Sequence, residues 1–286
     1  MADDLKHSAT QKNLVDTQSE VVDRKIALDR VGVRGLRTPI VVLDRDSVHQ
    51  NTVANISLSV NLPHHFKGTH MSRFVEVLER HRGEMTMRTL PRLCEDLRTR
   101  LDADAAHVTA TFPYFLEKPA PVSGAKALMD VECAFIGEVD ADHETFTLRV
   151  AVPVTSLCPC SKAISDYGAH NQRGIVTLEV RTRPVTASSP TSDAVEGAFE
   201  MIWIEELVAI AEASASAPVY PLLKRADERH VTMQAFDNPV FVEDMVRNAA
   251  RALMDDERVV WLKVMAENEE SIHNHAAFAE LEWARG

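Results

Sequence analysis

The chain has 286 residues, of which 45% are hydrophobic and 26% are charged, the composition of an ordinary globular protein. Its 43 acidic and 31 basic residues give a net charge of −12, which argues against general binding to nucleic acids or anionic membranes. No apolar run approaches the roughly 20 residues of a membrane-spanning helix, and the N-terminus lacks the apolar core of a signal peptide. Four cysteines are too few for a disulfide framework. We therefore expect a cytoplasmic protein.

The first part of the chain contains a polar tail and one round of strands and helices. Residues 1–25 lack a hydrophobic period, which predicts a flexible N-terminal tail. Ser72 is the expected N-cap of the first helix, Pro91 lies near the start of the second, where proline is tolerated, and Asp140-Ala-Asp142 forms a turn. The elements predicted within residues 26–143 are strands at 39–43 and 52–60, helices from about 72 and over about 87–101, and strands at 107–115 and 127–139.

Residues 144–286 repeat the same order of patterns. Thr186–Ser192 (TASSPTS) is the clearest loop of the chain. The predicted elements are strands at about 144–155 and 174–183, a long helix from Ser192 to Ala213, a second helix starting at Pro239 with Asn238 as its N-cap, and strands at 259–266 and 276–283. We therefore expect an α+β chain of two tandem β-β-α-α-β-β units, the second of which contains most of the functional site.

Cys158-Pro-Cys160 is the sharpest local feature of the sequence. Two thiols around a proline, at the end of an apolar strand, can present a thiolate to a metal or a substrate. If the segment is extended, both side chains can reach the same cavity, because residues two apart share one side of a strand. His170 follows in a glycine-bounded loop. Each residue alone is most simply a packing or surface residue, but together they favour a site, and a structural zinc site is the less favoured kind.

Two acidic segments are further candidates. Asp227-Glu228-Arg229-His230 is either a solvated charged run before a strand or loop, or the source of a carboxylate that completes a Cys/His/Glu metal set with one position open to water. Glu243 follows Pro239 by four residues, in the first turn of the second predicted helix. On sequence alone it is most simply an acidic residue favoured by the helix dipole.

Histidines and cations elsewhere give weaker signals. His273-Asn-His275 would place two imidazoles on one face of a strand, which permits a ligand pair or an acid/base pair, although such histidines are more often merely exposed. Lys67–Phe74 (KGTHMSRF) precedes a helix and could bind phosphate through backbone N–H groups, but it lacks the P-loop spacing. Cys94 and Cys133 fall on core faces, and we expect them only to pack.

Five segments in this order resemble GTP cyclohydrolase I of the prokaryotic type IB. The matching segments are Asn61-Leu-Pro63 with Lys67–Phe74, Leu157–Lys162 with Tyr167–Arg173, Pro218–Arg225 with Asp227-Glu228, Asn238–Asp244, and Asn268–His273. They span nearly all of the chain after the tail, and five segments in one order are far more specific than any single motif. The resemblance implies the tunnelling fold, in which two β-β-α-α-β-β units form one subunit, in agreement with the two rounds of patterns.

Carried onto this sequence, the resemblance implies a divalent metal ion, which is zinc, manganese or iron, held by Cys158, His170 and Glu228. It implies a catalytic role for Cys160, an acid/base role for His273 and a purine-anchoring carboxylate at Glu243. The other substrate-binding candidates lie in matched segments and suit a triphosphate by their charge: Lys67, His70, Arg73, Lys162, Arg173, Lys224 and Arg225. Some of them can come from a neighbouring subunit, because the resemblance also implies a homotetramer with sites at subunit interfaces.

The implied reaction converts GTP and water to 7,8-dihydroneopterin triphosphate and formate, the first step of pterin and folate biosynthesis. Neither nucleic acid nor membrane is expected as a partner. Three alternatives stay open. A nitrile reductase acting on a 7-deazaguanine would need NADPH and would leave His170 without a metal, and a dihydroneopterin aldolase or epimerase would not need Cys158-Pro-Cys160. A metal-storing or thiol-redox binding module would bind metal without turning over GTP.

Overall fold

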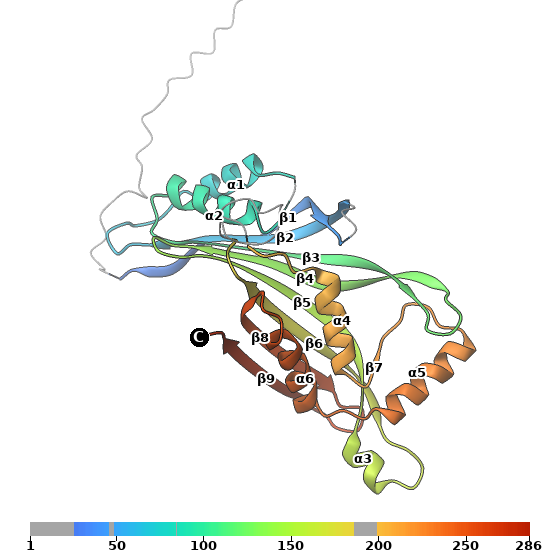
Figure 1. The fold of residues 1–286 in the computed structure, drawn as a ribbon. Helices are drawn as coiled ribbons and strands as arrows, with labels where there is room; N and C mark the ends of the chain where they lie inside the picture. The colour runs from blue at the N-terminus through green and yellow to red at the C-terminus, as the bar shows by residue number, and fades with distance from the viewer. Residues whose placement is uncertain (1–25, 46–48, 84, 186–198) are drawn as a thin grey trace, which may run out of the picture.

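The computed structural model describes residues 26–45, 49–83, 85–185 and 199–286. The predicted N-terminal tail and the predicted loop at 186–192 lie outside these residues. Within them the chain forms one antiparallel sheet of nine strands, with helices packed against it (Figure 1). No helix in the described part of the chain is long and apolar enough to cross a membrane.

The first half of the sheet follows the predicted order of the first unit. Its strands are neighbours in sequence as well as in space, and two helices interrupt them after the second strand. The elements are β1 (Leu28–Leu43), β2 (His49–Leu62), α1 (Met71–Arg80), α2 (Thr89–Arg100), β3 (Ala106–Pro119) and β4 (Lys126–Val139).

The second half continues the same sheet, because β4 pairs with β5. Its elements are β5 (Glu144–Leu157), α3 (Pro159–Ile164), β6 (Asn171–Thr182), α4 (Ile204–Ser214), β7 (Ala217–Pro218), α5 (Arg225–Asp237), α6 (Val242–Met254), β8 (Val259–Glu269) and β9 (Ala276–Ala284). The path through the sheet is β1-β2-β3-β4-β5-β6-β8-β9, with the short β7 paired to β5. The predicted α+β class, with two rounds of two strands, helices and two strands, is confirmed.

Three predicted helix boundaries are wrong. Ser72 lies inside α1, because the Arg73 N–H already bonds to the carbonyl of His70, which occupies the N-cap position. Asn238 ends α5 instead of starting α6, and its amide donates to the Ala215 carbonyl at 3.0 Å. α6 begins only at Val242. Asn238 is therefore used to join segments that are distant in sequence, which local capping rules do not anticipate.

Two further predictions failed in the second unit. The long helix expected from Ser192 begins at Ile204, because Phe199 forms an isolated β-bridge with Pro184 and the Glu200 N–H bonds to the Arg183 carbonyl at 2.8 Å. Residues 192–198 lie outside the described residues. The charged run at 227–230, expected to precede a strand or loop, lies within α5, a helix whose apolar stripe is too weak to reveal it in the sequence.

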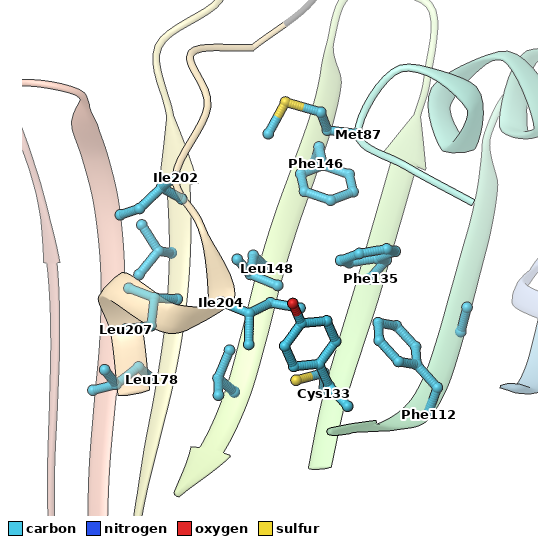
Figure 2. Close-up of a cluster of buried hydrophobic side chains, with 14 of the residues drawn as sticks. Met87, Phe112, Cys133, Phe135, Phe146, Leu148, Leu178, Ile202, Ile204 and Leu207 are labelled. Atoms are coloured by element: carbon cyan, nitrogen blue, oxygen red, sulfur yellow. The ribbon is translucent and has the colours of Figure 1, made fainter. Parts of the chain in front are cut away.

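The alternation of side chains along the strands explains how the sheet buries one face. In β2 the residues Ala54, Ile56, Leu58 and Val60 are at most 1% exposed, while the residues that alternate with them are accessible and, apart from Val53, polar. Equivalent rows in the other central strands form a continuous core with α1, α2, α4 and α6. Figure 2 shows part of this core, where Leu178 and Leu148 of the sheet lie beside Ile204 and Leu207 of α4.

Cys94 and Cys133 belong to this core, as predicted. Both side chains are fully buried, Cys94 in α2 and Cys133 in β4 (Figure 2). Burial raises the pKa of the Cys94 thiol to about 12, and burial also raises the pKa of Cys133 well above its usual range. Neither thiol is available as a thiolate near neutral pH.

Candidate active site

The core becomes polar at one end of the sheet, where β5 ends and β6 begins. The buried rows of β5, β6 and β8 are apolar along their length but finish in Ser156, Gln172 and Asn268, which are 1%, 7% and 2% exposed. Ser156 pairs with Gln172, and Asn268 pairs with Gly174. The three polar side chains therefore form one layer that closes the core at this end.

A hydrogen-bond network runs through this layer to His170. Asn268 Nδ2 donates to Ser156 Oγ at 3.0 Å, and Gln172 Nε2 donates to Ser156 Oγ at 3.4 Å and to Glu270 Oε1 at 3.3 Å. Gln172 Oε1 lies 2.8 Å from His170 Nδ1, and Glu270 Oε2 lies 3.6 Å from the same nitrogen. Ser156, Gln172 and Glu270 were not among the candidate site residues predicted from the sequence. A signal for Ser156 was present, because it is a polar residue in a row of otherwise apolar alternate residues of β5.

Gly174 makes room for this layer. A Cβ atom at this position would lie 2.1 Å from Asn268 Oδ1 and 3.1 Å from the Glu267 carbonyl oxygen. Atoms that are not bonded do not approach so closely, so any side chain at residue 174 would displace Asn268. The glycine that bounds the predicted loop is thus required by close packing of β6 against β8.

Cys158 and His170 are joined across the base of the loop that contains α3. The Cys158 N–H donates to the His170 carbonyl at 3.1 Å, and the His170 N–H donates to Ser161 Oγ at 3.3 Å. Cys158 occupies the N-cap position of α3, where its Sγ accepts from the Ser161 N–H at 3.4 Å. The structure therefore brings together the two residues that the sequence singled out most strongly.

The backbone after Cys158 is helical instead of extended, which corrects the expected geometry of the two thiols. Residues two apart in a helix are rotated by about 200° around its axis, so Cys158 and Cys160 point in different directions. Cys160 is exposed, whereas Cys158 is half-buried. Within one chain the two thiols do not share one cavity in the way that an extended segment would allow.

His273 approaches the same place from the turn between β8 and β9. This segment is a turn, not the strand in which the pattern would have put His273 and His275 on one face. The two rings nevertheless stack, with centroids 5.1 Å apart, and the His273 ring lies edge-on to His170 at a centroid distance of 6.5 Å. His170, His273 and His275 thus form a chain of neighbouring imidazoles at this end of the sheet.

Asp227 fixes the start of α5 at this end of the molecule. The Asp227 carboxylate is buried and accepts hydrogen bonds from Ser123 Oγ and from the backbone N–H groups of Val122, Ser123 and Lys224. Burial alone would raise the pKa of Asp227, but these four hydrogen bonds outweigh it and hold the pKa well below its usual range. The tip of the β3–β4 hairpin is thereby tied to the first turn of α5, where the next residue is the exposed Glu228.

The other predicted residues of the second unit lie around the same end. Lys162 Nζ donates to the Phe236 carbonyl and lies 4.2 Å above the Phe236 ring, which joins α3 to α5. The Val240 N–H donates to the Leu157 carbonyl at 3.3 Å and so places the start of α6, with the exposed Glu243, beside Cys158. Lys224 and Arg225 are exposed at the start of α5, and Arg173 is exposed on the face of β6 opposite to Gln172.

The cations of the first unit lie at the opposite end of the sheet. Val60, near the end of β2, pairs with Ala106, which pairs with Val139, which pairs with Glu144 at the start of β5. Lys67, His70 and Arg73 follow β2 at this level, whereas Cys158 follows the far end of β5. Fourteen residues of β5 separate the two levels, about 45 Å at roughly 3.3 Å per residue (Figure 1).

The predicted metal ligands are only partly gathered within one chain. Among the described residues, one group of three potential ligands has all its ligand atoms within 4.8 Å of one another: Asp140, Asp142 and His143. These exposed residues form the predicted turn between β4 and β5, in which the Asp140 carboxylate accepts hydrogen bonds from the backbone N–H groups of Asp142 and His143. Cys158, His170 and Glu228 do not form such a group. The chemistry of the donors still suits a borderline divalent ion, since Cys158 and His170, which bear a thiol and an imidazole, are joined through their backbones.

Comparison with known proteins gives three results. The family model described as type I GTP cyclohydrolase folE2 matches residues 14–279. The chain is 48% identical over 274 residues to GTP cyclohydrolase FolE2 of Nitrosococcus oceani, covering 96% of this chain and 97% of the relative, and 50% identical over 268 residues to GTP cyclohydrolase FolE2 of Syntrophotalea carbinolica, covering 94% of each. Among solved structures, uricase from Arthrobacter globiformis has a TM-score of 0.51 at 11% identity, covering 90% of this chain and 93% of that chain, a likeness of fold that matches the predicted tunnelling fold.

Proposed function

The chain belongs to the family of type I GTP cyclohydrolases named FolE2, and from this premise we propose how its residues convert GTP and water to 7,8-dihydroneopterin triphosphate and formate. GTP cyclohydrolase activity is the first step of folate biosynthesis. We assign the chain to the type IB subdivision, because the Cys158-Pro-Cys160 segment and the four other matched segments occur in the order that this type implies.

We propose that Cys158, His170 and Glu228 hold a divalent metal ion, which is zinc, manganese or iron. The observation that carries this proposal is the hydrogen bond of 3.1 Å that joins the backbones of Cys158 and His170, because it makes a thiol-bearing residue and an imidazole-bearing residue neighbours across the base of the α3 loop. Asp227 supports the third ligand by fixing the first turn of α5. When bound, the ion would supply Lewis-acid chemistry that generates a nucleophile from water near neutral pH.

The purine is held and its ring opened by groups of this chain. The Glu243 carboxylate accepts two hydrogen bonds, from the N1–H and the 2-amino group of guanine, whereas adenine has no such pair of donors on that edge. His273 passes a proton to the purine nitrogen that leaves C8 as the imidazole ring opens, because an imidazole can both take up and release a proton near neutral pH. Cys160 acts beside C8 as a thiol that is not committed to the metal.

The triphosphate is bound by cations that two copies of the chain contribute. Lys162, Arg173, Lys224 and Arg225 lie at the end of the sheet where Cys158 follows β5, but Lys67, His70 and Arg73 lie about 45 Å away along the sheet. A single chain cannot bring both sets to one substrate. A homotetramer with its sites at subunit interfaces lets the β2–α1 segment of one copy meet the Cys158 region of another. The large exposed side chains of Ile164 and Tyr167, 87% and 99% accessible beside this region, suit such an interface.

The test is to incubate the purified full-length protein with GTP and a divalent metal and to assay formate and the fluorescent oxidised pterin. We expect both products in a fixed ratio. Reduction of a nitrile with consumption of NADPH would indicate the reductase alternative, cleavage of dihydroneopterin would indicate the aldolase alternative, and bound metal without release of formate would indicate a metal-storing module. In parallel, His170→Ala should lower the bound metal, and full metal content in that variant would remove His170 from the ligand set.

A further inference from the structure

We propose that Gln172 and Glu270 are positioning residues that hold His170 in a single tautomer, with its proton on Nδ1 and the lone pair of Nε2 free for a metal ion. The inference rests on the proposed role of His170 as a metal ligand, and it assigns functions to two residues outside the predicted site. It follows from the direction of each hydrogen bond in the polar layer described above.

Glu270 determines which way the amide of Gln172 points. An ionised carboxylate has acceptors only, so the Gln172 atom that lies 3.3 Å from Glu270 Oε1 must be the donor Nε2. The same nitrogen donates to Ser156 Oγ at 3.4 Å. Turning the amide around would set its oxygen against the carboxylate oxygen and would leave both contacts without a donor. The orientation of Gln172 is therefore imposed by its neighbours.

The orientation of Gln172 then determines the tautomer of His170. Gln172 Oε1 is an acceptor 2.8 Å from His170 Nδ1, so Nδ1 must be the ring nitrogen that bears the proton. The negative charge of Glu270, with Oε2 3.6 Å from the same nitrogen, favours the proton there as well. In a neutral imidazole the other nitrogen, Nε2, then bears the lone pair, which is the form in which histidine binds a metal.

Burial makes this arrangement costly to change. Gln172 is 7% exposed, and the side chains of His170 and Glu270 are 11% and 14% exposed. Water is poorly placed to replace a lost partner at these positions, so the other tautomer would leave a buried acceptor and a buried donor unsatisfied. The chain thus prepares the imidazole before a metal arrives, and the network accounts for the polar residues that interrupt an otherwise apolar core face.

The tautomer can be measured directly by ¹⁵N–¹H NMR of the full chain after removal of metal by chelation. The His170 signals are identified by their loss in His170→Ala. We expect the pattern of an Nδ1–H tautomer in the wild type and a mixture of tautomers in Gln172→Leu, which has no acceptor facing Nδ1. An Nε2–H tautomer in the wild type, or an unchanged tautomer in Gln172→Leu, would overturn the proposal. This NMR readout is made without metal. The proposed function is tested separately, by the metal content of His170→Ala, so either proposal can fail without the other.

Metal binding gives the second readout, with a control on the same strand. Titration with zinc should show that Gln172→Leu binds about 10- to 100-fold more weakly than the wild type, with a smaller loss in Glu270→Gln. Thr182→Val, at the far end of β6, removes another buried side-chain hydrogen bond, from Thr182 Oγ1 to the Glu200 carbonyl at 2.6 Å, and should bind zinc as the wild type does. The positioning role would be contradicted if both variants bound zinc as tightly as the wild type. It would also be contradicted if both lost affinity by the same factor, because general destabilisation would then explain both losses.

Discussion

The two ends of the sheet differ in how they are equipped for chemistry. At the end where β5 runs into α3, the backbone of Cys158 is joined to His170, and the His170 side chain meets both a buried amide network and the ring of His273. Asp227 fixes the start of α5 at the same end. At the other end, β2 is followed by Lys67, by His70 at the N-cap of α1 and by Arg73 in its first turn, and the described turn between β4 and β5 has an exposed cluster around Asp140. One end has groups that can activate water, and the other has cations that can hold phosphate.

This difference is the basis of the proposal that a complete site requires more than one copy of the chain. Both ends belong to the segments that resemble type IB GTP cyclohydrolase, yet β5 holds them about 45 Å apart. In a rigid antiparallel sheet, that distance cannot be closed by movements of loops. The end with Cys158, which we call the metal end, and the end with Lys67, which we call the cation end, are therefore expected to fail in different ways when they are altered.

The largest effect is expected from Cys158→Ala at the metal end. Loss of the thiolate removes one of three proposed ligands, so bound metal should fall and formate release should be abolished. The same outcome is expected for Glu228→Ala. Metal analysis and a formate assay on the same preparation check this prediction, and a variant with full metal content and activity would exclude that residue from the ligand set.

Cys160→Ala should separate catalysis from metal binding within the metal end. Because the two thiols point in different directions from α3, we expect this variant to keep its metal and to lose turnover. GTP should also protect Cys160 from alkylation in the metal-loaded enzyme, while the buried Cys94 and Cys133 stay unmodified with or without GTP. Peptide mapping after alkylation measures this. Equal metal loss in Cys158→Ala and Cys160→Ala would mean that both thiols are ligands, and an active Cys160→Ala enzyme would deny it a catalytic role.

Glu243→Gln should impair recognition of guanine without altering the metal. An amide presents one acceptor where two guanine donors need partners, and it sets its own N–H₂ group against one of them. Leaving a donor unpaired costs about 1–3 kcal/mol, a loss of roughly 5- to 150-fold in kcat/KM for GTP. Steady-state kinetics check this value, with metal content as the control. Unchanged kinetics would show that Glu243 only favours the start of α6 through the helix dipole.

Arg73→Ala at the cation end should have the smallest effect of the four. A lost charge-assisted hydrogen bond to a triphosphate is expected to raise KM for GTP on the order of tenfold, with little change in kcat and none in metal content. Kinetics and metal analysis together test the separation of the two ends. A lowered metal content in Arg73→Ala would show that the cation end also shapes the metal site.

Much of the fold was predictable because periodicity is a local property. The alternation of the predicted strand at 52–60 is visible in its own residues, and the strand is confirmed as β2, which is longer by three residues at its start and by two at its end. α5 was missed because its residues 225–237 have little apolar stripe of their own and are held by Asp227 and by Lys162, whose partners lie more than 70 residues away. Such tertiary bonds leave no periodic trace in the sequence.

The site was predictable in composition but not in geometry. Cys158, His170 and His273 were identified by residue type and resemblance, and the structure places them together. The helical backbone at Pro159 and Cys160 was missed, because a proline after a strand suits an extended segment as well as the first position of a helix. Gln172 and Glu270 were missed because a glutamine within an apolar row has no motif. Only the pairing of β6 with β5 and with β8 shows which side chains surround Gln172.

Mixing a metal-end variant with a cation-end variant tests most directly whether one site needs both ends from different copies. Cys158→Ala and the double variant Lys67→Ala/Arg73→Ala can be co-expressed with different affinity tags, and tandem purification then selects oligomers that contain both. Random assembly of such oligomers gives one site in about four with both ends intact, so we predict roughly a quarter of wild-type formate release at subsaturating GTP. Activity no higher than the average of the two parent variants, in oligomers shown to contain both tags, would contradict the account.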